Sequence, residues 1–149
     1  MSNKKQGVIM ALEANVEAFM KDNTFAVLSA FRKNGAAQLS VVNTGPFRDG
    51  VAFTTTSGRA KLNNLRRDPR CSLMVSQSDW RDYVVLEGRA TIMDADNTDA
   101  DELREAFREV FRVASHSEHP NWPEYDQAMR DDNRAIVIVV PDHVYGTAV

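Results

Sequence analysis

The sequence of 149 residues lacks several features that define common protein classes. Its single cysteine, Cys71, cannot form an internal disulfide, which excludes a secreted fold built on disulfides. Its longest strongly apolar run, residues 135–140, is far too short to cross a bilayer. The apolar run at residues 8–12 stops at Glu13, and no apolar core of a cleavable signal follows. These absences predict a soluble, cytoplasmic protein.

Repeats, low-complexity tracts and a flexible linker are also missing, and the 7 glycines and 5 prolines are scattered along the chain. The 18 Lys and Arg residues stand against 21 Asp and Glu residues, and this net charge of −3 argues against a general nucleic-acid coat. Hydrophobic residues make up 43% of the chain, which argues against disorder and suffices for a core. We therefore expect a single domain over residues 1–149.

Turn signals and periodicity predict a mainly β fold. Residues 24–33 are rich in β-branched and aromatic residues and lead into Asn34-Gly35, the dipeptide favoured in tight hairpins. Strands are expected over residues 24–33, 36–47, 51–56, 71–76, 83–93 and 134–140, with residues 143–146 closing the sheet. Helices are expected over residues 8–21, 58–67, 94–109 and 123–131. Because no strand–helix–strand alternation runs along the chain, these elements indicate a small antiparallel barrel.

Residues 54–61 carry the clearest functional pattern. They leave a strand and enter a helix, with three threonine hydroxyls, an expected N-cap at Ser57, and the cations Arg59 and Lys61. Backbone N–H groups at a helix start, the helix dipole and full positive charges all favour an anion. Gly58 removes side-chain bulk where a phosphate would approach. The pattern predicts a phosphate site, and the alternative is a solvated helix face with an ordinary serine cap.

Two other patterns are interpreted as structural. His116 and His119 flank Glu118, but no cysteine accompanies them, so we expect a solvated helix end and no metal site. Cys71 has no histidine near it in the sequence, which favours a small core residue over a nucleophile.

Residues 59–70 (RAKLNNLRRDPR) resemble the pyridoxamine 5′-phosphate oxidase-like family, which has the FMN-binding split barrel, and within it the branch that uses the deazaflavin coenzyme F420. Weaker similarities occur in the family's order at residues 25–29, 38–42, 87–90 and 143–146, so the resemblance covers roughly residues 10–147. It implies a mainly β fold with flanking helices, a six-stranded antiparallel split β-barrel. It also implies a homodimer with two cofactor sites at the subunit interface.

The resemblance also assigns cofactor-binding residues. They are Ser40, Val41, Val42 and Asn43 at the edge of the flavin-type ring; Thr54, Thr55 and Thr56 along the phosphate and ribityl chain; Arg59, Ala60 and Lys61 at the phosphate; and Gln77 and Trp80 from the second subunit over the ring. A basic groove of Arg66, Arg67 and Arg70 would attract the acidic tail of a deazaflavin, and the alternative there is a solvated basic helix end.

The implied activity is hydride transfer from F420 to an unsaturated small-molecule acceptor. An FMN-dependent oxidoreductase and a non-enzymatic flavin or F420 carrier are the alternatives. The phosphate motif has Arg-x-Lys in place of adjacent Arg and Lys, and no Arg- and Trp-rich segment follows Gly146, which disfavours oxidation of pyridoxamine phosphate. The proton donor stays open among Tyr145, Arg48 and bulk water.

Overall fold

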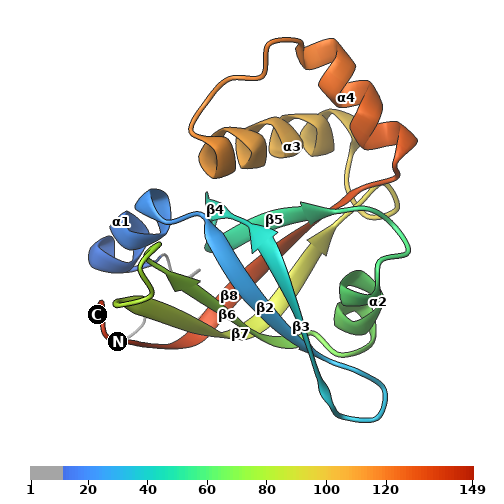
Figure 1. Cartoon of the computed structure of the whole chain (residues 1–149). Helices are drawn as coiled ribbons and strands as arrows, with labels where there is room; N and C mark the ends of the chain where they lie inside the picture. The colour runs from blue at the N-terminus through green and yellow to red at the C-terminus, as the bar shows by residue number, and fades with distance from the viewer. Residues whose placement is uncertain (1–11) are drawn as a thin grey trace, which may run out of the picture.

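The structure, a computed structural model, describes residues 12–149 as a curled antiparallel sheet with flanking helices (Figure 1). The elements are α1 (Ala14–Asp22), β2 (Phe25–Phe31), β3 (Ala37–Asn43), β4 (Gly45–Phe47), β5 (Gly50–Thr55), α2 (Ala60–Arg67), β6 (Arg70–Ser76), β7 (Tyr83–Met93), α3 (Ala100–Ser115), α4 (Trp122–Asp131) and β8 (Ala135–Tyr145). The strand order is β3-β2-β6-β7-β8-β5-β4. The mainly β split-barrel architecture is therefore confirmed.

The sheet has seven strands where six were expected, because the strand expected over residues 36–47 is divided at Thr44. The backbone N–H and the hydroxyl of Thr44 both donate to the carbonyl of Thr24, at 2.6 and 3.0 Å. On one side of this bend β3 pairs with β2, and on the other side β4 pairs with β5. The two edges of the sheet are thus consecutive in the chain, and the barrel is split between them.

Two apolar layers explain why residues 135–140 form a continuous hydrophobic run. Ala135, Val137 and Val139 on β8 pack into the barrel interior. Ile136 and Ile138 point to the other face of the sheet, where α3 and α4 cover them. Figure 1 shows these two helices together on one side of the barrel. Because side chains alternate along a strand, a strand covered on both faces is apolar at every position.

The expected helix over residues 94–109 is displaced along the chain, since α3 begins at Ala100 and ends at Ser115. The Asp99 side chain accepts the N–H groups of Asp101 and Glu102 and caps the helix. Asp94 Oδ1 accepts the N–H groups of two residues in the preceding turn. These short acidic side chains bond to local backbone, which favours turns and caps over a helical face.

The other expected elements differ mainly at their ends. Residues 143–146 do not form a separate closing strand, because β8 continues to Tyr145 beside β7. That ladder shifts register between Glu87 and Gly88 and then resumes. Helix α1 begins at Ala14, and residues 8–11 of the helix expected there lie outside the described residues.

Candidate cofactor-binding site

The split in the barrel creates the central feature of the site. The ladder between β4 and β5 ends where Gly45 pairs with Ala52. Two residues further along the same register Asn43 would face Thr54, but β3 has already turned away to pair with β2. A cavity of about 280 Å³ lies there, lined by Asn43, Thr54 and Arg134 together with side chains of α3 and α4. We call it the split cavity.

The three threonines at the end of β5 do not share one face. Thr54 lines the split cavity, and its Oγ1 accepts a hydrogen bond of 3.2 Å from Nη1 of Arg134. Thr55 alternates to the barrel interior, where it is only 4% exposed. The hydroxyls of residues 54–56 therefore do not converge as the sequence pattern alone indicates.

The turn from β5 into α2 has a different N-cap residue from the one expected. Helix α2 begins at Ala60 with Arg59 at the N-cap, so the prediction of Ser57 as the capping side chain is wrong. The Arg59 N–H bonds to the carbonyl of Thr56 at 3.3 Å, closing a turn with Gly58 at φ 87°. A side chain at Gly58 would meet nothing within 4 Å. The left-handed backbone, not a lack of space, accounts for the glycine.

The first turn of α2 presents hydrogen-bond donors to its surroundings. The carbonyl of Arg59 accepts the N–H groups of Leu62 and Asn63, which start the helical ladder. Among residues 12–149, the N–H groups of Ala60 and Lys61 have no backbone acceptor. Donors of this kind at a helix start are satisfied by water, by capping side chains or by an anionic ligand.

Three cations lie beside these donors. Partial burial lowers the pKa of Lys61, and the positive charges of Arg59 and Arg134 lower it further. Within residues 12–149, neither Arg59 nor Lys61 has a carboxylate within 4.0 Å. Nε of Arg134 is buried without a hydrogen-bond partner, and the carboxylate of Asp132 lies 3.7 Å from it. A bound anion would relieve the repulsion among these three cations.

Arg134 was not identified from the sequence, because it lies 80 residues beyond Thr54. Strand pairing brings it to the site, since Ala135 at the start of β8 pairs with Thr55 at the end of β5. A cation directly before the most apolar strand of the chain is the only local signal that marks it.

The other end of α2 has a different electrostatic character. Arg66 forms an ion pair of 2.8 Å with Asp94, and Arg70 forms one of 2.7 Å with Asp68. Arg67 donates to a backbone carbonyl of β2 at 2.7 Å. These contacts favour a structural interpretation of the three arginines over the groove for an acidic cofactor tail.

Strand β3 brings the four expected ring-edge residues to the border of the barrel. Val41 and Asn43 point outward, whereas Val42 is buried and the Ser40 hydroxyl is buried without a hydrogen-bond partner. Because β3 pairs only with β2 among the strands of residues 12–149, its other side presents backbone N–H and C=O groups without a partner strand there. A flat ring with polar edges could bond to such a strand through the backbone.

Gln77 and Trp80 are not brought to the split cavity of their own chain. They line a separate cavity of about 160 Å³ on the outer face of the sheet, with Phe25 and Val41. None of the residues lining that cavity also lines the split cavity. Within one chain they therefore do not meet the residues of the phosphate segment.

The residues considered for other chemistry have ordinary surroundings. Burial raises the pKa of the Cys71 thiol to about 12, as expected for a core residue. Nδ1 of His119 accepts the N–H of Asn121, and its ring contacts Phe111 edge-on at 5.2 Å. Among residues 12–149, no group of three or more His, Cys, Asp or Glu side chains is placed to hold a metal ion.

The two side chains considered as proton donors do not line the split cavity. Arg48 forms an ion pair of 3.3 Å with Glu102, and Tyr145 stacks on His143 at a centroid distance of 5.6 Å. In the described part of the chain, no helix is long and apolar enough to cross a membrane.

Known proteins match the chain over nearly its full length. The family model described as pyridoxamine 5′-phosphate oxidase matches residues 12–148. A conserved hypothetical protein from Mycobacterium tuberculosis aligns with a TM-score of 0.75 and 20% identity, over 95% of this chain and 87% of that chain. An F420 reductase aligns with a TM-score of 0.64 and 19% identity, over 87% and 94%. The heme storage protein from Vibrio cholerae aligns with a TM-score of 0.65 and 13% identity, over 91% and 94%. At these identities the structural matches show a shared fold.

Proposed function

Because the chain belongs to the pyridoxamine 5′-phosphate oxidase family, we propose that it is an oxidoreductase that uses the deazaflavin coenzyme F420 to transfer a hydride to an unsaturated small-molecule acceptor. The observation that carries the proposal is the charge at the start of α2, where Lys61 feels the positive charges of Arg59 and of Arg134, and Arg134 lines the split cavity. The F420 reductase with the same fold supports this choice of cofactor. FMN is the alternative cofactor.

The residues beside the split cavity suit a phosphate group. Arg59 and Lys61 supply charge without an acidic neighbour in the described chain, and the N–H groups of Ala60 and Lys61 supply donors. The unpartnered Nε of Arg134 supplies a third charged donor. The Thr54 hydroxyl, already bonded to Arg134, can donate its own hydrogen to a ligand oxygen. Charge-assisted bonds of this kind are the strong ones in phosphate recognition.

The edge of β3 would hold the ring through its unpaired backbone and through the side chains of Val41 and Asn43. The deazaflavin supplies the hydride when it is bound. The chain then has to orient the ring and the acceptor and exclude water, which are the main requirements for hydride transfer. Arg48 and Tyr145 do not line the split cavity, which leaves a water molecule as the simplest source of a proton.

A second copy of the chain would complete the site. In the part of the chain that the structure describes, four large apolar side chains are 65–71% exposed, namely Phe25, Leu39, Val41 and Trp80. Exposed apolar side chains grouped on a face are typical of an interface, and a cavity lined by Phe25, Val41 and Trp80 places three of these on the outer face of β2, β3 and β6. A homodimer built on this face would allow Gln77 and Trp80 of one chain to cover the ring held by its partner.

The oligomeric state tests this arrangement. We expect a dimer by light scattering in dilute solution and a monomer for Leu39→Asp, because a buried unpaired carboxylate opposes association. Val149→Asp is the matched control, since Val149 is exposed but lines a cavity beside α1 instead. A wild-type monomer that binds the cofactor tightly would contradict the placement of the site at an interface.

A carrier function is the second candidate, and the heme storage protein of the same fold favours its inclusion. Titrations of the purified chain with F420, FMN and hemin, followed by fluorescence and absorbance, separate the cofactors. We expect F420 to bind most tightly, and tighter binding of FMN or hemin would overturn the choice of cofactor. Turnover of reduced F420 with a panel of unsaturated acceptors then separates an enzyme from a carrier.

A further inference from the structure

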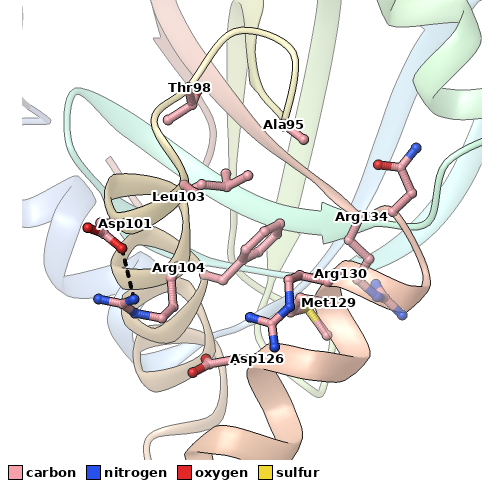
Figure 2. A pocket seen from close by; sticks show the side chains of 12 residues that line it. Ala95, Thr98, Asp101, Leu103, Arg104, Asp126, Met129, Arg130 and Arg134 are labelled. Carbon is pink, nitrogen blue, oxygen red and sulfur yellow. Dashed lines mark hydrogen bonds and ion pairs between the residues drawn. The ribbon is translucent and has the colours of Figure 1, made fainter.

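Another cavity, of about 400 Å³, lies between α3, α4 and the turn that precedes α3. Figure 2 shows Leu103 and Arg104 on α3, with Met129 and Arg130 on α4 on the opposite side of the cavity. Leu103 and Phe107 are buried and belong to the apolar layer under the two helices. Ligand sites for small molecules typically have about 300–1,000 Å³ and an apolar lining with a few polar groups. The cavity has both properties.

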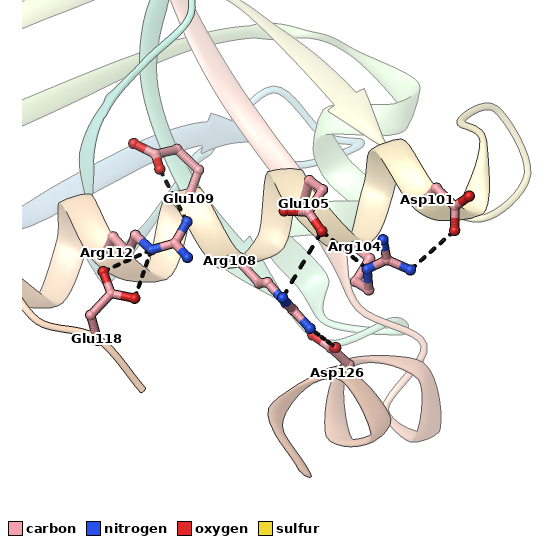
Figure 3. Close-up of polar contacts among 8 residues, drawn as sticks. All are labelled: Asp101, Arg104, Glu105, Arg108, Glu109, Arg112, Glu118 and Asp126. Carbon is pink, nitrogen blue, oxygen red and sulfur yellow. Dashed lines mark hydrogen bonds and ion pairs between the residues drawn. The ribbon is translucent and has the colours of Figure 1, made fainter. Parts of the chain in front are cut away.

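The charged side chains around this cavity differ in their hydrogen-bond and ion-pair partners. Asp126 is held by Arg108 through two hydrogen bonds, and Asp101 accepts a bond of 3.0 Å from Arg104 (Figures 2 and 3). Arg130, by contrast, donates to the neutral amide of Gln127 at 2.7 Å. It has no carboxylate within 4.0 Å among residues 12–149. One guanidinium at the rim is therefore available to an external anion.

The charges around Asp126 favour an anionic ligand over a cationic one. Asp126 is 8% exposed, and the hydrogen bond from Arg108 lowers its pKa, with further lowering by the charges of Arg104 and Arg130. Three arginines thus surround one buried carboxylate. The carboxylates that pair with Arg104 are exposed, and exposed pairs are well screened by solvent. The side chains that line the cavity consequently carry a small excess of positive charge, since Arg104, Arg130 and Arg134 stand against Asp101 and Asp126.

We propose that this cavity binds a small organic anion with a flat apolar body, of the arene carboxylate class. The carboxylate pairs with the guanidinium of Arg130, and the apolar body lies against Leu103, Phe107 and Met129. A planar guanidinium matches a carboxylate with two parallel hydrogen bonds, and an aromatic floor favours a flat partner. This site does not depend on the proposed cofactor, because only Arg134 borders both this cavity and the split cavity.

Nuclear magnetic resonance titration of the full chain with 1-naphthaleneacetate tests the proposal, with the neutral 1-naphthaleneacetamide as the matched probe. We expect saturable shifts of the amide signals of Leu103, Phe107 and Met129, and about tenfold weaker binding of the amide. The signals of Asn43, at the split cavity, and of Lys61, at the start of α2, should not move. Equal affinity for the two probes, or shifts confined to Phe25, Val41 and Trp80 on the outer sheet, would overturn the proposal.

Two variants locate the site. Arg130→Gln should reduce the affinity for the acid to that for the amide, whereas Arg32→Gln should change neither. Arg32 follows β2 directly and bonds to Ala36 across the hairpin to β3, and this hairpin lies far from α3 (Figure 1). Ala100→Trp places a large side chain at an exposed position that lines the cavity, and it should abolish binding of both probes. If the acid bound Arg130→Gln as tightly as the wild type, or bound Ala100→Trp unchanged, the site would not be the one proposed.

Discussion

The basic residues at the start of α2 and those on α3 differ in their partners. On α3, Arg104, Arg108 and Arg112 each contact at least one carboxylate (Figure 3). At the start of α2, Arg59 and Lys61 contact none in the described chain, although acidic residues outnumber basic ones in the sequence. The two regions therefore place the same type of charge in opposite electrostatic settings.

This difference indicates different roles for the two regions. The arginines of α3 form ion pairs that connect this helix to its neighbours. Arg108 pairs with Asp126 on α4, and Arg112 pairs with Glu118 in the loop between α3 and α4. At the start of α2, burial and the positive charges of Arg59 and Arg134 disfavour the charged form of Lys61, so this charge opposes the stability of the fold. Uncompensated charge of this kind is typical of functional sites, where stability is sacrificed for binding.

The largest expected effect separates the two ends of α2. Arg59→Ala with Lys61→Ala should weaken binding of the phosphorylated cofactor by about 3 kcal/mol or more, because each charge-assisted bond contributes about 1.5–3 kcal/mol. Arg66→Ala with Arg70→Ala removes the same charge from the last turn of α2 and the start of β6 and should leave binding almost unchanged. Isothermal titration calorimetry measures both, and equal losses in the two double variants would contradict the assignment.

On α3 the expected effect is on stability. Asp126→Ala should lower the free energy of unfolding by about 2 kcal/mol, because it removes both hydrogen bonds that the guanidinium of Arg108 donates to a buried carboxylate. Asp101→Ala is the matched control, because Asp101 is 83% exposed and its pair with Arg104 should contribute less than about 0.5 kcal/mol. Urea unfolding gives both values. Similar losses in the two variants would show that burial does not distinguish these pairs.

The pair of Arg108 and Asp126 also predicts a pH dependence. The hydrogen bond from Arg108 holds the pKa of Asp126 below that of an unfolded carboxyl, about 3.9. The resulting stabilisation is therefore present at neutral pH and is lost as the pH falls through the lower pKa of the folded state. The stability difference between the wild type and Asp126→Asn should shrink below about pH 4. A difference that stays constant down to pH 2 would contradict this account.

The smallest expected effect is a gain in stability, whereas the substitutions above lower binding or stability. Burial and neighbouring positive charge lower the pKa of Lys61, so its charged form destabilises the folded state at neutral pH. Lys61→Met should raise the melting temperature slightly while it weakens cofactor binding. Differential scanning calorimetry in phosphate-free buffer measures the change, and a lower melting temperature would show that Lys61 has a structural partner.

Much of the fold could be predicted from the sequence because local signals agree with it. The Asn34-Gly35 turn, the alternation of residues 83–93 and the apolar run at residues 135–140 all correspond to observed elements. The division at Thr44 could not be predicted, because it depends on two bonds to Thr24, which lies 20 residues earlier in the chain, just before β2. The start of α3 was misplaced because caps and turns use the same acidic residues as a solvated helix face.

The candidate site could be predicted only where it is continuous in sequence. Residues 59–61 stand out as a charged motif, but Arg134 joins them only through the pairing of β5 and β8. The inward direction of Thr55 follows from strand alternation, which the cluster of hydroxyls concealed. Whether Gln77 and Trp80 reach a cofactor depends on a second copy of the chain, which a single sequence does not place.

The central claim is that the start of α2 binds the phosphate of a redox coenzyme. The most direct measurement compares the affinity of the chain for F420 with its affinity for the phosphate-free deazaflavin, in the wild type and in the variant with Arg59→Ala and Lys61→Ala. Our account predicts that the wild type strongly prefers the phosphorylated form and that the variant loses the preference. Equal affinities in the wild type, or a preference that survives in the variant, would contradict it.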